Sequence, residues 1–267
     1  MRELAPAKIN PCLYLGPLRA DRRHELVSVM QSISLCDELW ISDGARDEVV
    51  CAGVEGPNLA AEAIARFREA TGWDGPGQRI SIDKRIPVAA GLGGGSADAA
   101  AALRLLVRRS GLDVPWQSLL EIAASLGADV PGALRPGRVL ARGAGEQITA
   151  LADPEPYGIL VLASDKQLST AAVYAQADRM GLPRASLDGV DTSVLLNELA
   201  PAAIALEPSI EDALGRVRRA GASTSLVSGS GPTVIGFFES LSRASAAVEQ
   251  LGPRAHAARP VGHNWGP

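Results

Sequence analysis

The sequence predicts an α+β fold with two lobes, and three observations support this. Strand-like and helix-like segments follow one another without the strict strand–helix–strand order of a doubly wound sheet. The chain has 267 residues, a length near which a single hydrophobic core tends to split. The stretch 152–156 holds two prolines and two acids. We take it as the boundary between an N-terminal lobe, residues 1–152, and a C-terminal lobe, residues 153–267.

The first half of the chain is predicted to begin with strands. Residues 2–16 and 24–42 alternate apolar and polar side chains and contain β-branched and aromatic residues, which is typical of strands. A helix is expected after Asn58, because apolar side chains then recur on one helical face. These side chains are Leu59, Ala63, Ile64 and Phe67.

A short strand over 79–86 is expected to lead into a glycine-rich segment and then into the clearest helix of the chain, 97–110. A further helix is predicted over 116–126. Gly111 and Gly127 follow these two helices at the position where a left-handed cap is favoured.

The second half also mixes both kinds of element. Strands are expected within 137–162, and Tyr157 to Leu162 is nearly continuous in apolar residues. The remaining predicted elements are helices near 171–180, 210–220 and 242–251, and strands near 222–228 and 233–238.

The composition excludes several classes of protein. Apolar residues make up 46% and charged residues 21% of the chain, a balance typical of globular proteins. The formal net charge is −4, so the chain lacks the basic surface of a nucleic-acid binder. No stretch approaches the ~20 apolar residues that span a bilayer, and the N-terminus has no apolar leader. We expect a cytoplasmic protein without nucleic-acid or membrane partners, as a monomer or weak homodimer.

Three cysteines, Cys12, Cys36 and Cys51, are widely spaced and form no metal-binding or disulfide pattern. We interpret them as reduced core residues, and the sequence predicts no metal site made of protein side chains.

A glycine-rich loop between the strand 79–86 and the helix 97–110 is the strongest functional motif. Glycines let backbone N–H groups approach an anion, and a helix N-terminus adds free donors and a positive dipole end. No Gly-Lys-Ser/Thr follows, so the loop is not a Walker A motif. A purely structural turn is the alternative, but we favour a phosphate-binding loop. Its residues are Ala90, Gly91, Leu92, Gly93, Gly94, Gly95 and Ser96.

A second glycine cluster, 228–233, joins two apolar strands and by itself is weak evidence, because Gly-Ser-Gly turns are common in structural proteins. Lys8 and Asn10 lie two apart in an apolar strand and therefore point to the same face. Asp129 directly follows a helix end, and His24 stands alone in the first half. Each of these residues, taken singly, is also compatible with a solvated surface, a turn or a cap.

Taken together and in this order, the motifs change the interpretation. The sequence resembles the GHMP kinases over residues 5 to 240, and especially those members that phosphorylate an alcohol linked to cytidine diphosphate. The similarity rests on six segments. They are Pro6-Ala7-Lys8-Ile9-Asn10, His24-Glu25-Leu26, Gly91-Leu92-Gly93-Gly94-Gly95-Ser96, Leu126-Gly127-Ala128-Asp129-Val130-Pro131, Gly143-Ala144-Gly145-Glu146 and Ser228-Gly229-Ser230-Gly231-Pro232-Thr233.

The resemblance implies a two-lobe α+β fold with the active site in the cleft between the lobes and ATP on the glycine-rich loop. Asp129 would accept the proton of a tertiary hydroxyl group, and Lys8 would keep Asp129 ionised and neutralise charge on the moving phosphoryl group. Asn10 would orient the substrate, and His24 would hydrogen-bond the cytosine edge.

Two further substrate contacts follow from the same resemblance. Thr170 would bind a substrate phosphate and Tyr174 would stack on the base. Mg²⁺ should accompany ATP and bridge its phosphate oxygens, with Ser96 as a candidate ligand.

The chain departs from the family pattern where the substrate base is expected. The family usually reads Arg-x-Asp-Gly-Tyr-His there, whereas this chain places Arg22 and Arg23 before His24. Arg23 would have to replace the stacking aromatic ring, since a guanidinium group can also stack on a base. A second departure is the Asn-Glu-Leu-Ala stretch at 197–200, where the family commonly has an acidic residue after the leucine. We attach no mechanism to this change. Two alternatives stay open: a GHMP kinase for another small alcohol or acid, and a non-catalytic relative that only binds nucleotide.

Overall fold

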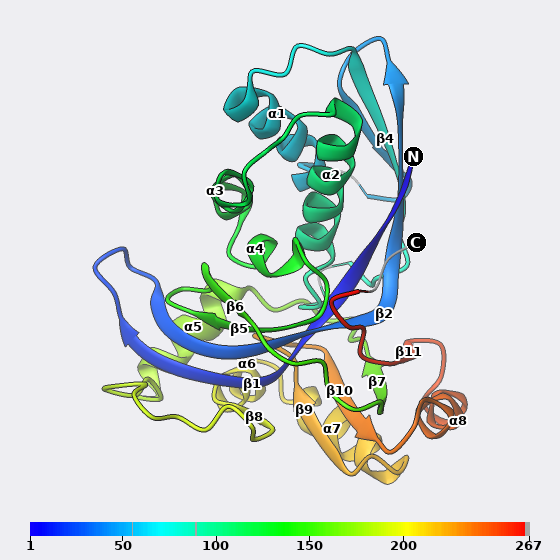
Figure 1. Ribbon diagram of the computed structural model, residues 1–267. Helices are drawn as coiled ribbons and strands as arrows, with labels where there is room; N and C mark the ends of the chain where they lie inside the picture. The colour runs from blue at the N-terminus through cyan, green and yellow to red at the C-terminus, as the bar shows by residue number, and fades with distance from the viewer. Residues whose placement is uncertain (55, 89, 265–267) are drawn as a thin grey trace.

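Two β-sheets and the helices packed on them form the fold in the computed structural model, which describes residues 1–54, 56–88 and 90–264 (Figure 1). The larger sheet has the strand order β3-β4-β2-β1-β8, with β5 added to β2 and β6 added to β5. The smaller sheet has the order β11-β7-β10-β9. This mixed arrangement confirms the α+β prediction.

The larger sheet is built around two long antiparallel strands, β1 (Arg2–Leu18) and β2 (His24–Gly44). Four helices lie on one face of this sheet, three of them packed on its strands and α3 mainly on the other helices (Figure 1). They are α1 (Leu59–Thr71), α2 (Gly94–Ser110), α3 (Trp116–Leu126) and α4 (Val130–Ala133). The other strands are β3 (Glu48–Cys51), β4 (Gly77–Asp83), β5 (Arg138–Arg142), β6 (Gln147–Ala150) and β8 (Leu196–Asn197).

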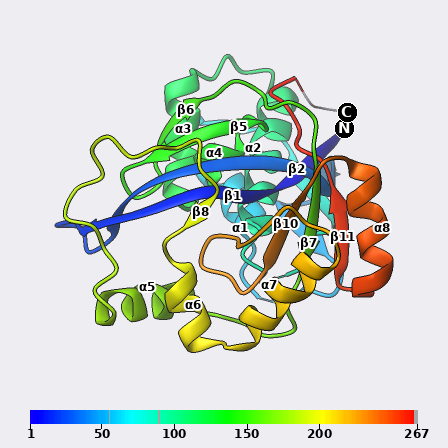
Figure 2. The same cartoon turned by 90° about the horizontal axis from the view of Figure 1, so that it is seen from below.

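The smaller sheet is buried on both faces, which explains the nearly continuous apolar run of its central strand β7 (Gly158–Leu162). Leu160 and Leu162 face the helical side, whereas Ile159 and Val161 face β1. Helices α7 (Ser209–Arg219) and α8 (Leu241–Leu251) lie along the outer face, seen from below in Figure 2. The neighbouring elements are α5 (Thr170–Arg179), α6 (Ala200–Leu206), β9 (Thr224–Val227), β10 (Val234–Phe238) and β11 (Ala255–Ala258).

Most predicted elements are confirmed, with differences at their ends. Asn58 caps α1 by accepting a hydrogen bond from the Ala60 N–H group, and Gly111 ends α2 with a left-handed φ of 68°. The predicted left-handed cap at Gly127 is wrong: its φ and ψ are both 158°, because the chain continues there in an extended conformation. Helix α2 begins at Gly94, three residues earlier than predicted, so part of the glycine-rich loop is its first turn.

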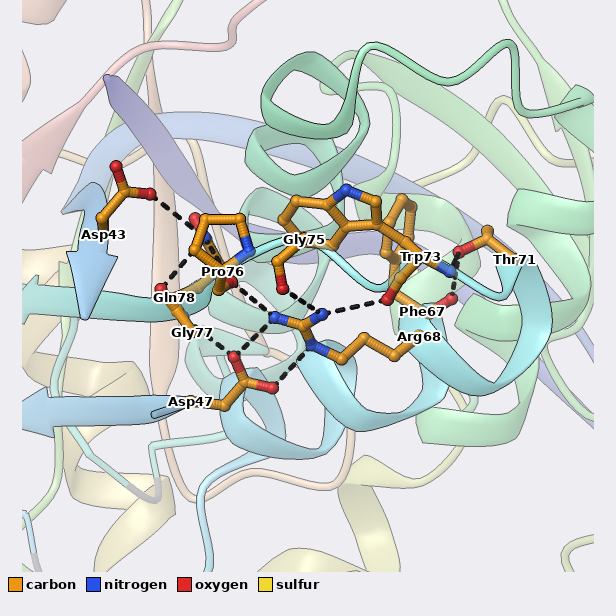
Figure 3. Close-up of polar contacts among 10 residues, drawn as sticks. All are labelled: Asp43, Asp47, Phe67, Arg68, Thr71, Trp73, Gly75, Pro76, Gly77 and Gln78. Carbon is orange, nitrogen blue, oxygen red and sulfur yellow. Dashed lines mark hydrogen bonds and ion pairs between the residues drawn. The ribbon is translucent and has the colours of Figure 1, made fainter. Parts of the chain in front are cut away.

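An arginine at the end of α1 ties the helix to the sheet edge far from the loop (Figure 3). The Arg68 guanidinium donates to both Asp47 carboxylate oxygens, at 2.7 and 2.9 Å, and also to the carbonyl oxygens of Trp73, Gly75 and Pro76. Its charge also lies 4.6 Å from the centre of the Trp73 ring. This network closes the connection between α1 and β4.

The two halves of the chain are interleaved around β1. Strand β8 comes from the second half but pairs in parallel with β1, and Leu13 and Leu15 of β1 lie in the core of the smaller sheet. The division at residue 152 therefore stays a prediction. None of the helices in the described parts of the chain is both long and apolar enough to cross a bilayer.

Candidate active site

The glycine-rich loop is fixed to the core by its apolar residues. Leu92 is 1% exposed and packs between the two sheets, together with Ile86 and Ala90. The Leu92 carbonyl oxygen accepts the Lys8 backbone N–H at 2.9 Å, so the loop is bonded directly to β1. Gly93 has a φ of 69° and precedes α2, whose N-terminus has no side-chain cap. The first N–H groups of α2 are therefore free to bind an anion.

The loop separates two cavities. The first, of about 400 Å³, is lined by all seven predicted loop residues, Ala90 to Ser96, and by Asn58, Lys84 and Asp98. The second, of about 280 Å³, shares Gly91, Gly93 and Ser96 with the first. Its other walls bring together distant parts of the chain: Lys8, Asn10, Asp129, Gly145, Thr170, Tyr174, Gly229 and Ser230.

A lysine and a carboxylate meet in the second cavity. Lys8 Nζ lies 3.3 Å from Asp129 Oδ2, although the two residues are far apart in sequence. Lys8 Nζ also donates to Asn10 Oδ1 at 2.8 Å, and Asn10 Nδ2 donates to the Ser28 hydroxyl at 2.8 Å. The buried Asn10 and Ser28 thus fix the ammonium group, while 39% of the Asp129 side chain remains exposed to the cavity side.

The second glycine cluster closes the same cavity. A Cβ atom on Gly91 would lie 2.8 Å from the Gly231 carbonyl oxygen, and one on Gly229 would lie 3.2 Å from Asn10 Oδ1. Both glycines also have left-handed φ values, 72° and 56°. Only glycine lets the two loops and β1 approach this closely. A motif that was weak by itself in the sequence is thus part of the site.

Two of the predicted substrate contacts line this cavity on the side of α5. Thr170 begins α5, and its hydroxyl lies 3.0 Å from the Ser230 hydroxyl of the second glycine cluster. Burial, together with the nearby Asp129, raises the pKa of Tyr174 to about 12. Tyr174 therefore presents a neutral aromatic ring to the cavity.

The other two predicted substrate contacts line neither of the two cavities. His24 is 6% exposed, and its Nε2 lies 2.8 Å from Asp178 Oδ1, with its ring centre 5.4 Å from that of Tyr174. The Arg23 guanidinium is paired with Asp21 at 3.1 Å and points to solvent. Arg22 has a left-handed φ of 64°. This explains why the family pattern has glycine at that position.

Several residues of the site were not predicted from the sequence. Asn58 and Lys84 line the first cavity, and Ser28 supports Asn10 behind the second. Buried Asn197 donates to the Val227 and Gly229 carbonyl oxygens, both at 2.7 Å, and so holds the second glycine cluster. Asn197 could have been found from the sequence, because an asparagine within a short apolar stretch is expected to be buried, and a buried amide needs hydrogen-bond partners.

Comparison with known sequences identifies the family of the chain. The family description "GHMP kinases N terminal domain" matches residues 58–137, and "GHMP kinases C terminal" matches residues 184–257. The 4-diphosphocytidyl-2-C-methyl-D-erythritol kinase of Geobacter sulfurreducens is 40% identical, and the alignment covers 96% of each chain. The enzyme of the same name from Corynebacterium efficiens is 41% identical, with 85% of this chain and 81% of the relative covered.

Solved structures give the same result. A crystal structure of 4-(cytidine 5'-diphospho)-2C-methyl-D-erythritol kinase superimposes with a TM-score of 0.85 and 34% identity, over 98% of this chain and 100% of the other. The L. major mevalonate kinase in complex with R-mevalonate has a TM-score of 0.71 but 15% identity, so it shows the shared fold alone. The chain belongs to the GHMP kinase family.

Proposed function

We propose that this protein is an ATP-dependent kinase that phosphorylates the 2-hydroxyl of 4-diphosphocytidyl-2-C-methyl-D-erythritol, a step of non-mevalonate isoprenoid precursor synthesis. The single observation that carries the proposal is the meeting of Lys8 and Asp129, 3.3 Å apart, in a cavity bordered by the glycine-rich loop. Relatives that are about 40% identical over most of the chain carry this activity in their names.

The first cavity is the nucleotide site in this proposal. Its volume of about 400 Å³ suits a small ligand, and one wall is made of loop backbone and the free N-terminus of α2. ATP phosphates would accept hydrogen bonds from these N–H groups. The side chains of Lys84 and Asn58 line the same cavity and supply polar contacts.

The second cavity takes the alcohol. Asp129 accepts the hydroxyl proton while the alcohol oxygen forms a bond to the γ-phosphorus atom of ATP, and the bond from that phosphorus to the β–γ bridging oxygen breaks to release ADP. Lys8 offsets negative charge on the transferred group, where positioning and charge neutralisation supply most of the catalysis. Asn10, which holds Lys8 at 2.8 Å, orients both the ammonium group and the substrate.

Mg²⁺ belongs to the proposal as a partner of ATP. In residues 1–54, 56–88 and 90–264, no three His, Cys, Asp or Glu side chains gather to hold a metal ion. The donor set nevertheless fits a magnesium ion that is bound mainly by phosphates, since such an ion needs only one or two protein oxygens. The Ser96 hydroxyl, which lines the second cavity, would provide one of them. When bound, the ion neutralises charge on the phosphate oxygens.

Recognition of the cytidine diphosphate part is assigned to the α5 side of the second cavity. Thr170 binds a substrate phosphate, and Tyr174 stacks on the base. The His24 ring lies 5.4 Å from the Tyr174 ring, and His24 would hydrogen-bond the base edge only after leaving Asp178. Arg23 contacts the base only after leaving Asp21. The protein acts in the cytoplasm, as a monomer or weak homodimer.

A phosphoryl-transfer assay tests the proposal. Purified protein, ATP and magnesium are incubated with the cytidyl substrate or with mevalonate, homoserine or galactose, and ADP release is measured. We expect ADP release with the cytidyl substrate alone. Preference for another acceptor would instead support a different GHMP kinase activity. The replacement of the usual aromatic residue by Arg23 is the observation that favours this alternative. ATP binding without transfer to any acceptor would overturn the enzymatic assignment.

A further inference from the structure

A buried carboxylate in β2 holds the chain just before the glycine-rich loop. Asp37 is completely buried. Its Oδ1 accepts the backbone N–H groups of Arg85 at 2.6 Å and Ile86 at 2.8 Å, and its Oδ2 accepts Lys84 Nζ at 2.5 Å. A buried charge is costly unless it is paired and hydrogen-bonded. Asp37 meets this condition with three consecutive residues that lead into the loop.

The same lysine connects Asp37 to the helix that follows the loop. Lys84 Nζ also donates to Asp98 Oδ2 at 2.9 Å, and Asp98 lies in the second turn of α2. Asp98 is 3% exposed, and its Oδ1 has no hydrogen-bond partner among the described residues. Strand β2 and helix α2 lie beside each other (Figure 1). Asp37 therefore holds the start of the loop directly and its end through Lys84.

The loop rests on the residues that Asp37 holds. A Cβ atom on Gly94 would lie 3.1 Å from Ile86 Cγ2 and 3.2 Å from Lys84 Nζ. A shift of Ile86 or Lys84 would therefore move the backbone at Gly94, which begins α2 and offers N–H groups to the first cavity.

We propose that Asp37 is a positioning residue: it sets the place of the phosphate-binding loop, and thereby the affinity for nucleotide, without contacting the nucleotide itself. The proposal rests on the proposed function, because it takes the first cavity as the ATP site. A carboxylate can accept three hydrogen bonds at this point, whereas an asparagine keeps one acceptor oxygen and presents an NH₂ group to Lys84. The chain ahead of the loop would then lose the hydrogen bond from Lys84 Nζ and keep only the two backbone hydrogen bonds from Arg85 and Ile86.

The test compares two buried acids that both hold α2. Asp37→Asn weakens the contacts at the end of α2 that is next to the glycine-rich loop, and Glu3→Gln is the matched control. Glu3 is 5% exposed in β1 and pairs with Arg104 and Arg108 in the C-terminal half of α2. ATP binding is measured by titration calorimetry without an acceptor, KM for each substrate by ADP release, and stability by thermal unfolding. Asp37→Glu, which keeps the charge but moves the carboxylate by one methylene group, is the conservative variant.

For Asp37→Asn we expect ATP affinity to fall about 10-fold or more, while KM for the acceptor stays within about 2-fold, because small displacements of binding groups have large effects. Asp37→Glu should retain part of the affinity. Glu3→Gln should lower the melting temperature but leave ATP affinity unchanged.

Wild-type ATP affinity in Asp37→Asn overturns the inference, as does an equal loss of affinity in Glu3→Gln, which would indicate general loosening of α2. If Asp37→Asn does not fold, Asp37→Glu decides: weaker ATP binding supports the proposal and unchanged binding overturns it. Failure of the wild-type protein to bind ATP overturns the proposed function and this inference with it, whereas normal behaviour of the Asp37 variants in an active kinase overturns the inference alone.

Discussion

Two lysine–aspartate groups lie on opposite sides of the glycine-rich loop. They consist of the same residue types but differ in exposure and in the number of their hydrogen bonds. Lys8 and Asp129 meet at 3.3 Å in the second cavity, where 39% of the Asp129 side chain is exposed. Lys84, by contrast, lies between Asp37 and Asp98, whose side chains are 0% and 5% exposed. Asp129 has no other polar partner among the described residues, whereas Asp37 accepts three hydrogen bonds.

The comparison shows how the surroundings decide what an ion pair can do. A carboxylate with free lone pairs at a cavity wall can accept a proton from a ligand. A fully buried carboxylate that already accepts three hydrogen bonds from its own chain is suited to hold that chain in place. The open pair is suited to chemistry and the buried cluster to positioning, and three predictions test this division.

Asp129→Asn should have the largest effect. Loss of the proton acceptor is expected to lower kcat by about 10²–10⁴-fold. Stability should hardly change, because the Asp129 side chain makes no capping bond to α4 and a partly exposed ion pair contributes at most ~1 kcal/mol. Steady-state kinetics and thermal unfolding are measured together, with the exposed Asp74→Asn as control. A kcat within about 10-fold of wild type would remove Asp129 from the chemistry.

Alanine at two glycines of the loop should act in opposite directions on stability. Gly93 has a left-handed φ of 69°, and a Cβ atom there would lie 2.9 Å from Lys8 Cγ. Gly93→Ala should therefore cost about 1–2 kcal/mol of unfolding free energy, displace Lys8 and lower kcat. At Gly95 the added Cβ would meet only Leu59 Cδ1 at 3.8 Å inside helix α2, so Gly95→Ala should add about 0.5–1 kcal/mol. Urea unfolding measures both, and a change of the same sign in the two variants would contradict this account.

Asp98→Asn should change stability in a way that depends on pH. Burial, together with Asp37 and despite Lys84, raises the pKa of Asp98 from 3.8 to about 7. The folded protein thus holds a proton that the unfolded chain releases near pH 4, so this group destabilises the fold progressively as the pH rises from 4 to 7. The melting temperature of Asp98→Asn minus that of wild type should increase over this range. A constant difference would mean that Asp98 stays ionised beside Lys84.

The elements could largely be predicted from sequence because each carried its own local signal. The strands β1 and β2 contain β-branched and aromatic residues, Asn58 caps α1, and Gly111 ends α2. Local signals failed where pairing is made by distant residues. Strand β8 has only two residues and forms through its contact with β1, and β3 pairs in parallel with β4. Neither pairing leaves a periodic pattern in the sequence.

The sequence by itself predicted a glycine-rich loop ahead of a helix, since this pattern depends only on residues that are neighbours along the chain, and the family resemblance singled out Lys8 and Asp129. Only the tertiary structure decided that these two side chains meet, that Arg23 pairs with Asp21, and that Asp37 holds the loop. The physical reason is the distance along the sequence over which each kind of interaction acts. Backbone conformation depends on neighbours along the chain, whereas the contacts of an ionised side chain depend on which residues the packed sheets bring within a few ångströms of it.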